Sequence, residues 1–430
     1  MKRIFLAFCI LLVAVAPATA ESRLFQGNLN GAAYKILVPD EDIWNGVLLL
    51  HAHWYYQTSI FPTEAEAAHS AALESFLLDR GYALAGSTFR GTGWQVKEGT
   101  EDLKALSDLF NELVEKPKKR ILMGYSAGSI IALKSAEEVP LYDGVMSMCS
   151  VIGNGPAVDR DGGVAYAYAS AFGGWPSGWG TWYDARDGLT FYGDVLPYLL
   201  GQLDPINNPD YYANLAKFEF IRLLFNLPLD GFYQPPSQSI PSQPIDARPA
   251  LAFLMYATTE VKGEIEAKAK GYFYENAGRS YALSTSDIAY LAYLGLDATP
   301  LLNQMNQEAT LTAAKPQKQY GAKYFDPTGD LIMPVLSVHS KNDHIYPTYF
   351  ETRLLEKVQD TSSEELLLQV YTNDFGHCMF TNDQTLSAIK AMEKWLDTGQ
   401  KPNPGDDTLF PTSEGFDHNH VPDPFPVGRN

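Results

Sequence analysis

A pentapeptide with serine at its centre constrains this chain more than any other feature. Gly124-Tyr125-Ser126-Ala127-Gly128 follows a short apolar stretch typical of a strand, Ile121 to Met123, and precedes a stretch typical of a helix, Ile130 to Lys134. A serine on a sharp turn between a strand and a helix exposes its hydroxyl, and the flanking glycines let the turn tighten. The sequence therefore predicts a nucleophilic serine at position 126, with an ordinary glycine-serine turn as the alternative.

Strand and helix patterns alternate on both sides of this pentapeptide. Such alternation predicts an α/β fold, in which a mostly parallel, twisted sheet carries helices on both faces. Strands are expected at Gly46 to His51, Gly81 to Ser87, Gly144 to Met148, Val335 to Val338 and Leu366 to Val370. Helices are expected at Thr63 to Arg80, Gly99 to Lys116 and Ser387 to Leu396.

The alternation stops between residues 155 and 324. Only helical patterns occur there, around Asp210 to Phe225, Asp246 to Ala269 and Ser286 to Gln307. We therefore expect a large, mainly helical cap at 155–324, inserted after the strand that follows the nucleophile helix. The α/β core would consist of 21–154 and 325–400, and 401–430 would be an irregular tail. Seven aromatic residues could line a pocket in this cap or form its own core: Tyr166, Tyr168, Phe172, Trp175, Trp179, Trp182 and Tyr183.

The first 20 residues have the three regions of a cleavable signal peptide. Lys2-Arg3 precedes an apolar run from Ile4 to Ala16, and Ala18-Thr19-Ala20 resembles a cleavage site. We therefore expect a periplasmic or secreted protein. The apolar run is too short to cross a bilayer, so no membrane insertion is expected.

The net charge of -19 disfavours nucleic acid as a partner. The sequence does not indicate an oligomeric state.

A serine nucleophile needs a histidine base and a carboxylate that orients the histidine. His377 lies in a glycine-containing loop between the last expected strand and the last expected helix, where it can reach the serine. Asp343 follows the strand at Val335 to Val338 directly. The competing carboxylate, Asp374, lies on the same short loop as His377 and has less freedom to orient it. We therefore predict Ser126, His377 and Asp343 as nucleophile, base and acid.

Two backbone N–H groups are also needed to bind the oxyanion that forms during acyl transfer. One should belong to Ala127, the residue after the nucleophile. The other should come from the loop after the first expected strand, where Trp54 is our choice and Tyr55 the alternative.

Four other histidines are possible metal ligands by residue type. His51 and His53 stand two apart at a strand end, but no acidic residue or further histidine follows at a useful spacing. His418 and His420, in the tail, are expected to lie in solvent. We therefore predict no metal site and no cofactor.

Together these features resemble the α/β-hydrolase superfamily. Ser126, Asp343 and His377 match the nucleophile, acid and base of that superfamily in their order along the chain, and Arg90-Gly91-Thr92-Gly93-Trp94 is similar to its loop after the fourth strand. Asp326-Pro327-Thr328-Gly329, Pro334-Val335-Leu336 and Gly376-His377-Cys378 resemble secreted bacterial serine hydrolases akin to the prolyl-peptidase and feruloyl-esterase branches. Tyr125 stands where the feruloyl-esterase and tannase group carries cysteine. The resemblance implies an α/β-hydrolase fold.

A disulfide is suggested by the same resemblance. Cys149 and Cys378 are the two cysteines left once the signal peptide is removed. Cys149 ends the strand after the nucleophile helix, and Cys378 adjoins the predicted base, so a bond between them would hold the histidine loop. The alternative is two separate buried thiols.

These inferences lead to three functional hypotheses. The first is a secreted serine hydrolase that cleaves small carboxylic esters through an acyl-enzyme. The second is a prolyl-type serine exopeptidase that acts on short peptides, whose cap would restrict access. The third is a non-catalytic binding protein on the same scaffold.

Overall fold

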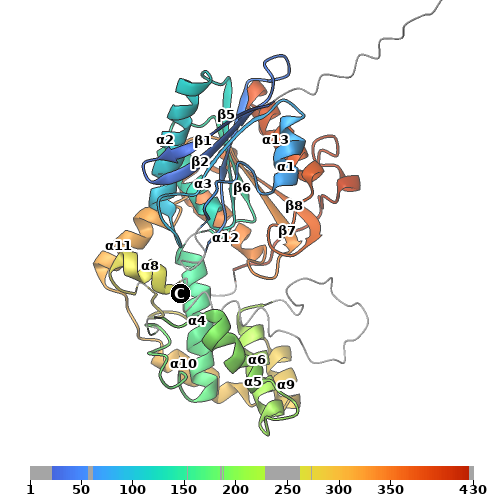
Figure 1. The fold of residues 1–430 in the computed structure, drawn as a ribbon. Helices are drawn as coiled ribbons and strands as arrows, with labels where there is room; N and C mark the ends of the chain where they lie inside the picture. Colours follow the sequence, from blue (N-terminus) through green and yellow to red (C-terminus); the bar gives the residue numbers. More distant parts are fainter. Residues whose placement is uncertain are drawn as a thin grey trace, which may run out of the picture.

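The structure is a computed structural model that describes residues 22–56, 62–152, 154–184, 186, 188–227, 262–272 and 274–425. The predicted signal peptide and much of the helix predicted at Asp246 to Ala269 lie outside these residues. Figure 1 shows a twisted sheet with flanking helices and a second group of helices at one end of it.

A single eight-stranded sheet forms the centre of the core, in the order β1-β2-β4-β3-β5-β6-β7-β8. The six strands from β4 to β8 in this order run parallel, and β1 and β2 form an antiparallel hairpin at one edge. The predicted α/β class is thereby confirmed. The strands are β1 (Arg23–Leu29), β2 (Ala32–Val38), β3 (Val47–Ala52), β4 (Ala83–Ser87), β5 (Lys119–Tyr125), β6 (Gly144–Met148), β7 (Val335–Asn342) and β8 (Leu367–Phe375).

The sequence-based prediction did not include the hairpin of β1 and β2. Its turn, Asn30-Gly31, has positive φ at both residues, 53° and 94°. Asn-Gly is the preferred sequence for this tight turn between antiparallel strands, so the signal was present in the chain.

Helices cover both faces of the sheet because the parallel strands are apolar on both sides. On β5, Ile121 packs toward one face and Leu122 toward the other. The first face is covered by α1 (Ala71–Leu78) and α13 (Asn382–Thr398), and the second by α2 (Val96–Leu113), α3 (Ala127–Glu138) and α12 (Tyr349–Asp360). Helix α1 begins later than predicted because the Ser70 hydroxyl caps it by accepting from the Leu73 N–H.

The segment between β6 and β7 is helical and contains no strand among its described residues. Its helices gather beyond the carboxyl end of the sheet, below the sheet in Figure 1. They are α4 (Asn154–Phe172), the π-helix Phe191–Val195, α5 (Leu196–Gln202), α6 (Tyr211–Leu224), α8 (Lys262–Ala269), α9 (Thr285–Tyr293), α10 (Ala298–Glu308) and α11 (Lys315–Tyr324).

Two features of these helices differ from the sequence-based prediction. The helix expected at Ser286 to Gln307 is two helices, α9 and α10, separated at Gly295, where φ is 89°. Helix α4 was not predicted because it runs through Gly162 and Gly163, which are poor helix formers. A Cβ on Gly162 would lie 2.3 Å from the Tyr274 ring, so the glycine permits close packing of that ring against α4.

The described part of the tail, 401–425, is largely irregular but is attached to the core. It contains a 3₁₀ turn at Thr412–Glu414 and a β-bridge between Phe416 and Thr372 of β8. His418 and His420 were expected in solvent, but both are half-buried. His418 Nε2 lies 2.7 Å from the Phe410 carbonyl oxygen, and His420 Nε2 lies 2.9 Å from the Thr348 hydroxyl.

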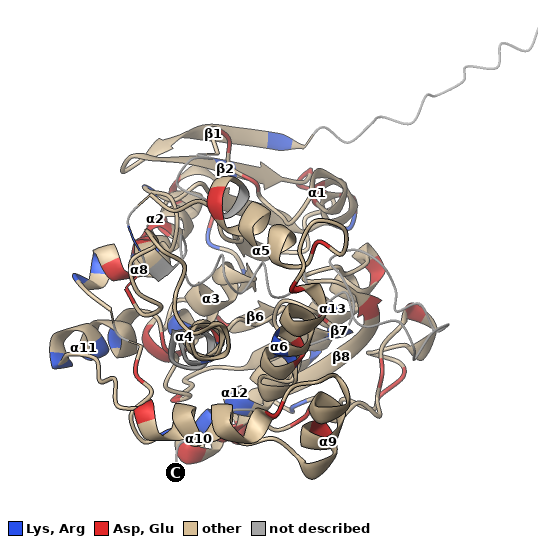
Figure 2. Cartoon of the chain, turned by 90° about the horizontal axis from the view of Figure 1, so that it is seen from below, with Lys and Arg blue, Asp and Glu red and all other residues tan. Residues whose placement is uncertain are grey.

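The charged residues are spread over the molecule. Figure 2, viewed from the cap, shows Asp and Glu on both core and cap, whereas the charged residues of α11 are all lysines. Among the described residues, every helix is too short or too polar to span a bilayer.

Candidate active site

Ser126 occupies a strained turn at the carboxyl end of β5. Its φ of 52° and ψ of -120° are unusual for a residue with a side chain. The turn is closely packed, because a Cβ on Gly124 would lie 2.1 Å from the Gly128 carbonyl oxygen. A glycine is therefore needed at position 124, and the tight packing holds the turn in place. The Ser126 N–H donates to the Met148 carbonyl at 3.1 Å, which ties the turn to β6. The side chain consequently stands at the head of α3 with its hydroxyl available.

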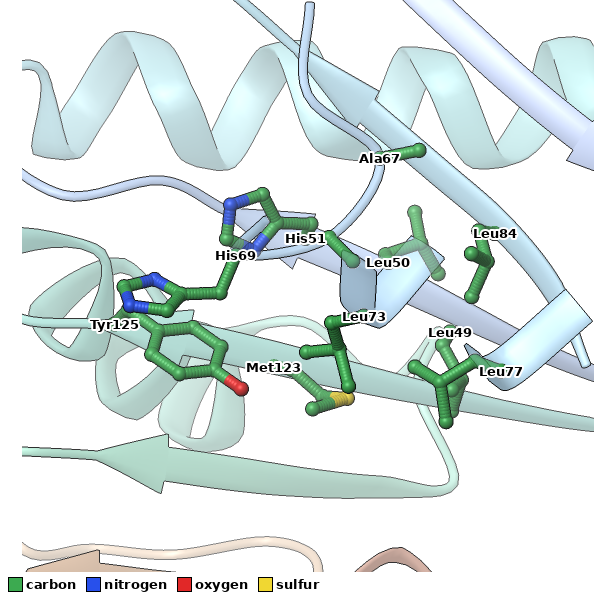
Figure 3. A pocket seen from close by; sticks show the side chains of 11 residues that line it. Leu49, Leu50, His51, Ala67, His69, Leu73, Leu77, Leu84, Met123 and Tyr125 are labelled. Carbon is green, nitrogen blue, oxygen red and sulfur yellow. The ribbon is translucent and has the colours of Figure 1, made fainter. Parts of the chain in front are cut away.

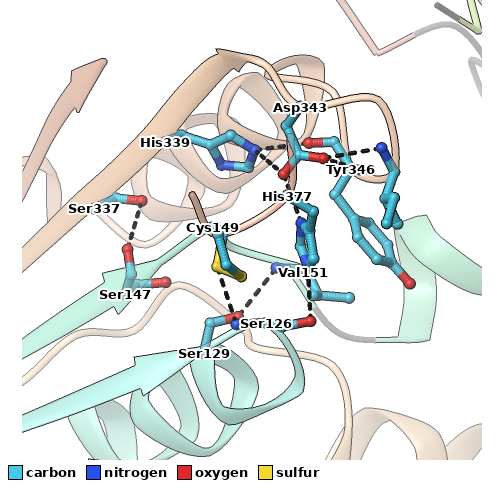
Figure 4. Close-up of a disulfide and its surroundings, with 12 residues drawn as sticks. Ser126, Ser129, Ser147, Cys149, Val151, Ser337, His339, Asp343, Tyr346 and His377 are labelled. Atoms are coloured by element: carbon cyan, nitrogen blue, oxygen red, sulfur yellow. Dashed lines mark hydrogen bonds and ion pairs between the residues drawn. A yellow bond between two sulfur atoms is a disulfide. The ribbon is translucent and has the colours of Figure 1, made fainter. Parts of the chain in front are cut away.

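His377 lies on the loop after β8 and bridges the other two predicted residues. Its Nε2 is 2.7 Å from Ser126 Oγ, and its Nδ1 is 2.6 Å from Asp343 Oδ2 (Figure 4). Residues 251 positions apart in the chain thus meet because β5 and β8 end at the same edge of the sheet. The arrangement allows Nδ1–H to donate to Asp343 while Nε2 accepts from the serine hydroxyl.

Asp343 is buried on the loop after β7, and its carboxylate is held from several directions. Oδ1 accepts the N–H groups of Ile345 and Tyr346, each at 2.9 Å. Burial alone would raise the pKa of Asp343, but His377 and His339 outweigh it and hold the pKa well below its usual range. Asp343 is therefore ionised beside His377. The competing Asp374 accepts from Gln384 Nε2 at 2.6 Å instead.

The loop after β3 packs directly against the elbow, the turn from Gly124 to Gly128 that carries Ser126. A Cβ on Gly128 would lie 2.1 Å from the Ala52 carbonyl oxygen and 2.7 Å from that of His53. His53 Nδ1 lies 2.6 Å from the Trp54 carbonyl oxygen, which fixes the peptide between Trp54 and Tyr55. The Ala127 N–H is the first of α3, where N–H groups have no intrahelical acceptor. Ala127 with Trp54 or Tyr55 stays a prediction for the oxyanion donors.

Gly128→Ala should test this close approach. The added methyl group would force the elbow away from the Ala52 carbonyl, so we expect a loss of about 1–3 kcal/mol in unfolding free energy, together with reduced turnover. Gly201→Ala in α5 is the matched control, because nothing lies within 4 Å of the position that its methyl group would take. Urea unfolding of both variants checks the prediction, and equal stability of the two would contradict it.

Cys149 and Cys378 form a disulfide, with their Cα atoms 5.1 Å apart. Cys378 follows His377 directly, and the Sγ of Cys149 lies 3.3 Å from the Ser126 N. Both cysteines have positive φ, 49° and 60°. The bond therefore connects the elbow side of the site to the loop that carries His377.

No histidine cluster suited to a metal is found among the described residues. The one group with ligand spacing there is Cys149, His377 and Cys378, and its two sulfur atoms are joined in the disulfide. His51 and His53 pack against aromatic rings instead. His51 contacts Tyr125 edge-on at 5.5 Å, and His53 stacks on Phe89 at 4.2 Å. Burial lowers the pKa of His53 to about 4, so it stays neutral.

His69, which was not predicted from the sequence, stacks on Tyr125 with ring centroids 4.2 Å apart. Burial, then the charge of His377, lowers the pKa of His69 to about 4. A small pocket lies beside it, on the α1 face of the sheet (Figure 3). This pocket is lined mostly by aliphatic side chains and does not include Ser126, Asp343 or His377, so it is separate from the candidate active site.

The cap aromatics pack largely on one another. Tyr166 and Trp182 lie 4.8 Å apart between ring centroids, and Tyr168 stacks on Phe172 at 4.3 Å. Phe172 also contacts Phe218 of α6 at 5.3 Å. These contacts account for the aromatics as a cap core, and a substrate role for any of them stays a prediction.

The chain is similar to a curated amidase and, more distantly, to a set of solved structures. No family model matches the chain. An o-phthalyl amidase from Xanthobacter agilis is 24% identical over 444 residues, which cover 90% of this chain and 89% of the relative.

Two solved structures illustrate the distant likeness. Feruloyl esterase B from Aspergillus oryzae has a TM-score of 0.45 and 13% identity, over 89% of this chain and 81% of that one. An acylaminoacyl peptidase in complex with Z-Gly-Gly-Phe-chloromethyl ketone has a TM-score of 0.41 and 10% identity, over 89% of this chain. The match spans 42% of the length of the peptidase.

The parallel strands, the strained serine turn between β5 and α3, and the loops after β7 and β8 have the arrangement of the α/β-hydrolase fold. On these grounds the chain has the α/β-hydrolase fold.

Proposed function

We propose that the chain is a serine hydrolase that cleaves small carboxylic esters through an acyl-enzyme. One observation carries the proposal: His377 lies within hydrogen-bond distance of both Ser126 Oγ, at 2.7 Å, and Asp343 Oδ2, at 2.6 Å. A serine hydroxyl gains nucleophilicity when a base accepts its proton, and this contact provides that base.

The proposed reaction has two halves. His377 Nε2 takes the proton of Ser126 as Oγ bonds to the ester carbonyl carbon, and the resulting oxyanion is stabilised by backbone N–H groups. His377 then gives this proton to the leaving alkoxide, and the acyl group stays on Ser126. Water enters, loses a proton to His377 and attacks the acyl carbon. The carboxylic acid leaves as Ser126 recovers its proton.

Asp343 has an electrostatic part in both halves. Its carboxylate accepts Nδ1–H, which fixes the orientation of the ring and stabilises the imidazolium when Nε2 takes a proton. Because Asp343 is almost completely buried, water screens this attraction little.

An amide is the second candidate bond, and the o-phthalyl amidase relative favours it. An amine is a poorer leaving group than an alkoxide, so an amidase depends more on protonation by His377. We expect the 4-nitrophenyl ester of a given acid to turn over at least about tenfold faster than the matched 4-nitroanilide, a difference of about 1.4 kcal/mol in barrier. Equal rates for the pair would instead support an amidase.

We also propose that the protein is located in the periplasm or outside the cell. The signal-like residues 1–20 and the disulfide between Cys149 and Cys378 both support it, because structural disulfides persist in oxidising compartments. Sequencing the amino terminus of protein recovered from the periplasm or medium tests it. Recovery of the intact first residue would contradict cleavage.

A further inference from the structure

A second histidine, His339, lies behind the carboxylate of Asp343 (Figure 4). It is the fifth residue of β7 and is completely buried. Its Nδ1 is 3.0 Å from Glu351 Oε1, and its Nε2 is 2.7 Å from the Tyr346 carbonyl oxygen. Nε2 also lies 3.4 Å from Asp343 Oδ2. Each ring nitrogen therefore faces oxygen atoms that accept hydrogen bonds.

These partners determine the charge of the ring. A neutral imidazole has one N–H and one acceptor nitrogen, so it cannot donate from both nitrogens. A carboxylate and a carbonyl oxygen offer no proton in return. With Glu351 ionised, only the imidazolium form of His339 satisfies both contacts. Burial alone would lower the pKa of His339, but Asp343 and Glu351 outweigh it and raise the pKa to about 10.

The other titratable groups around His339 do not change its assignment as an imidazolium. Glu351, in the first turn of α12, is buried and also accepts Gln369 Nε2 at 2.7 Å. Tyr371 is the neighbour on β8, and burial and Glu351 keep its phenol protonated by raising its pKa.

Two other basic side chains, His420 and Lys341, lie near His339. Burial lowers the pKa of His420 on the tail, so it is neutral. Lys341 of β7 pairs with Asp417 of the tail at 2.8 Å. His339 is therefore a buried cation between two buried anions, Glu351 on one side and Asp343 on the other.

We propose that His339 is a permanently charged positioning residue, whose imidazolium holds Asp343 in place and sets the pH at which His377 can act as the base. The proposal deepens the proposed function and depends on it. A bare carboxylate stabilises the protonated form of His377, and a cation beside that carboxylate opposes this effect. With His339 charged, His377 can therefore act as a base down to a lower pH.

The pH dependence of kcat/KM on an activated ester tests this role. In His339→Gln an amide replaces the ring, so hydrogen bonding is partly kept while the charge is lost. We expect the midpoint of the acid limb to move to higher pH by about 1 unit. Lost packing alone would lower the plateau and leave that midpoint unchanged. A folded His339→Gln variant with an unmoved midpoint would overturn the proposal. His420→Gln is the matched control, with an unchanged profile.

A second measurement reads the charge without turnover. Side-chain NMR of ¹³C,¹⁵N-histidine-labelled wild-type protein should show His339 protonated on both nitrogens at neutral pH and losing a proton only near pH 10. Glu351→Gln should lower that pH. A neutral His339 at neutral pH overturns the proposal even if His339→Gln does not fold. A protein that hydrolyses no ester, yet shows a protonated His339, overturns the proposed function and leaves the charge assignment standing.

Discussion

Replacing Ser126 by alanine is expected to lower kcat on any substrate by about 10⁴- to 10⁶-fold. The hydroxyl oxygen is the atom that would bond to the acyl carbon, and no other hydroxyl takes its place against His377 Nε2 among the described residues. The fold should be unaffected, because the strained turn is fixed by Gly124, Gly128 and the backbone contact to Met148. Turnover of a nitrophenyl ester, with circular dichroism to verify folding, measures the effect.

A fluorophosphonate probe separates this outcome from the binding-protein hypothesis. The probe should label wild-type protein and Ser75→Ala, an exposed control on α1, but not Ser126→Ala. Wild-type protein that resists labelling would favour a scaffold without catalysis. Undiminished ester turnover by Ser126→Ala would show that the nucleophile is elsewhere.

Much of this site could be predicted from sequence because parallel strands impose strong geometric rules. Once β5, β7 and β8 are recognised as strands of one sheet, the loops at their carboxyl ends have to lie near one another. Together with the serine pentapeptide, that rule was enough to nominate Ser126, Asp343 and His377, and the structure brings His377 within hydrogen-bond distance of the other two. It also nominated the pairing of Cys149 with Cys378, which follow β6 and β8.

The remainder depends on packing between distant segments, which a single sequence does not reveal. His339 follows the apolar stretch Val335 to Val338, beyond the end of the strand expected from the sequence, and its partner Glu351 lies 12 residues away on α12. Nothing in either local pattern shows that the two side chains meet. Helix α4 was missed for the same reason. In the sequence Gly162 indicates a break in the helix, and only the structure shows that the Tyr274 ring packs against this glycine.

Removing the disulfide should have the largest effect on stability. In Cys149→Ala with Cys378→Ala, we expect the unfolding free energy to fall by about 3–5 kcal/mol. The bond joins residues 229 positions apart, so it restricts the unfolded chain strongly. Alanine avoids leaving a buried hydroxyl without a partner at these two sites. Urea unfolding under oxidising conditions measures the loss.

The same variant should also lose activity, since the bond holds the loop that carries His377. Without the bond, the remaining ties near the base include the Gly376 N–H to the Asn342 carbonyl, which is long at 3.3 Å. We expect kcat/KM to fall about tenfold or more, because small displacements of a catalytic group are costly. Dithiothreitol should destabilise wild-type protein and leave the double variant unchanged. If the reductant affected both equally, or if wild-type protein carried two free thiols, the loop would owe its position to other contacts.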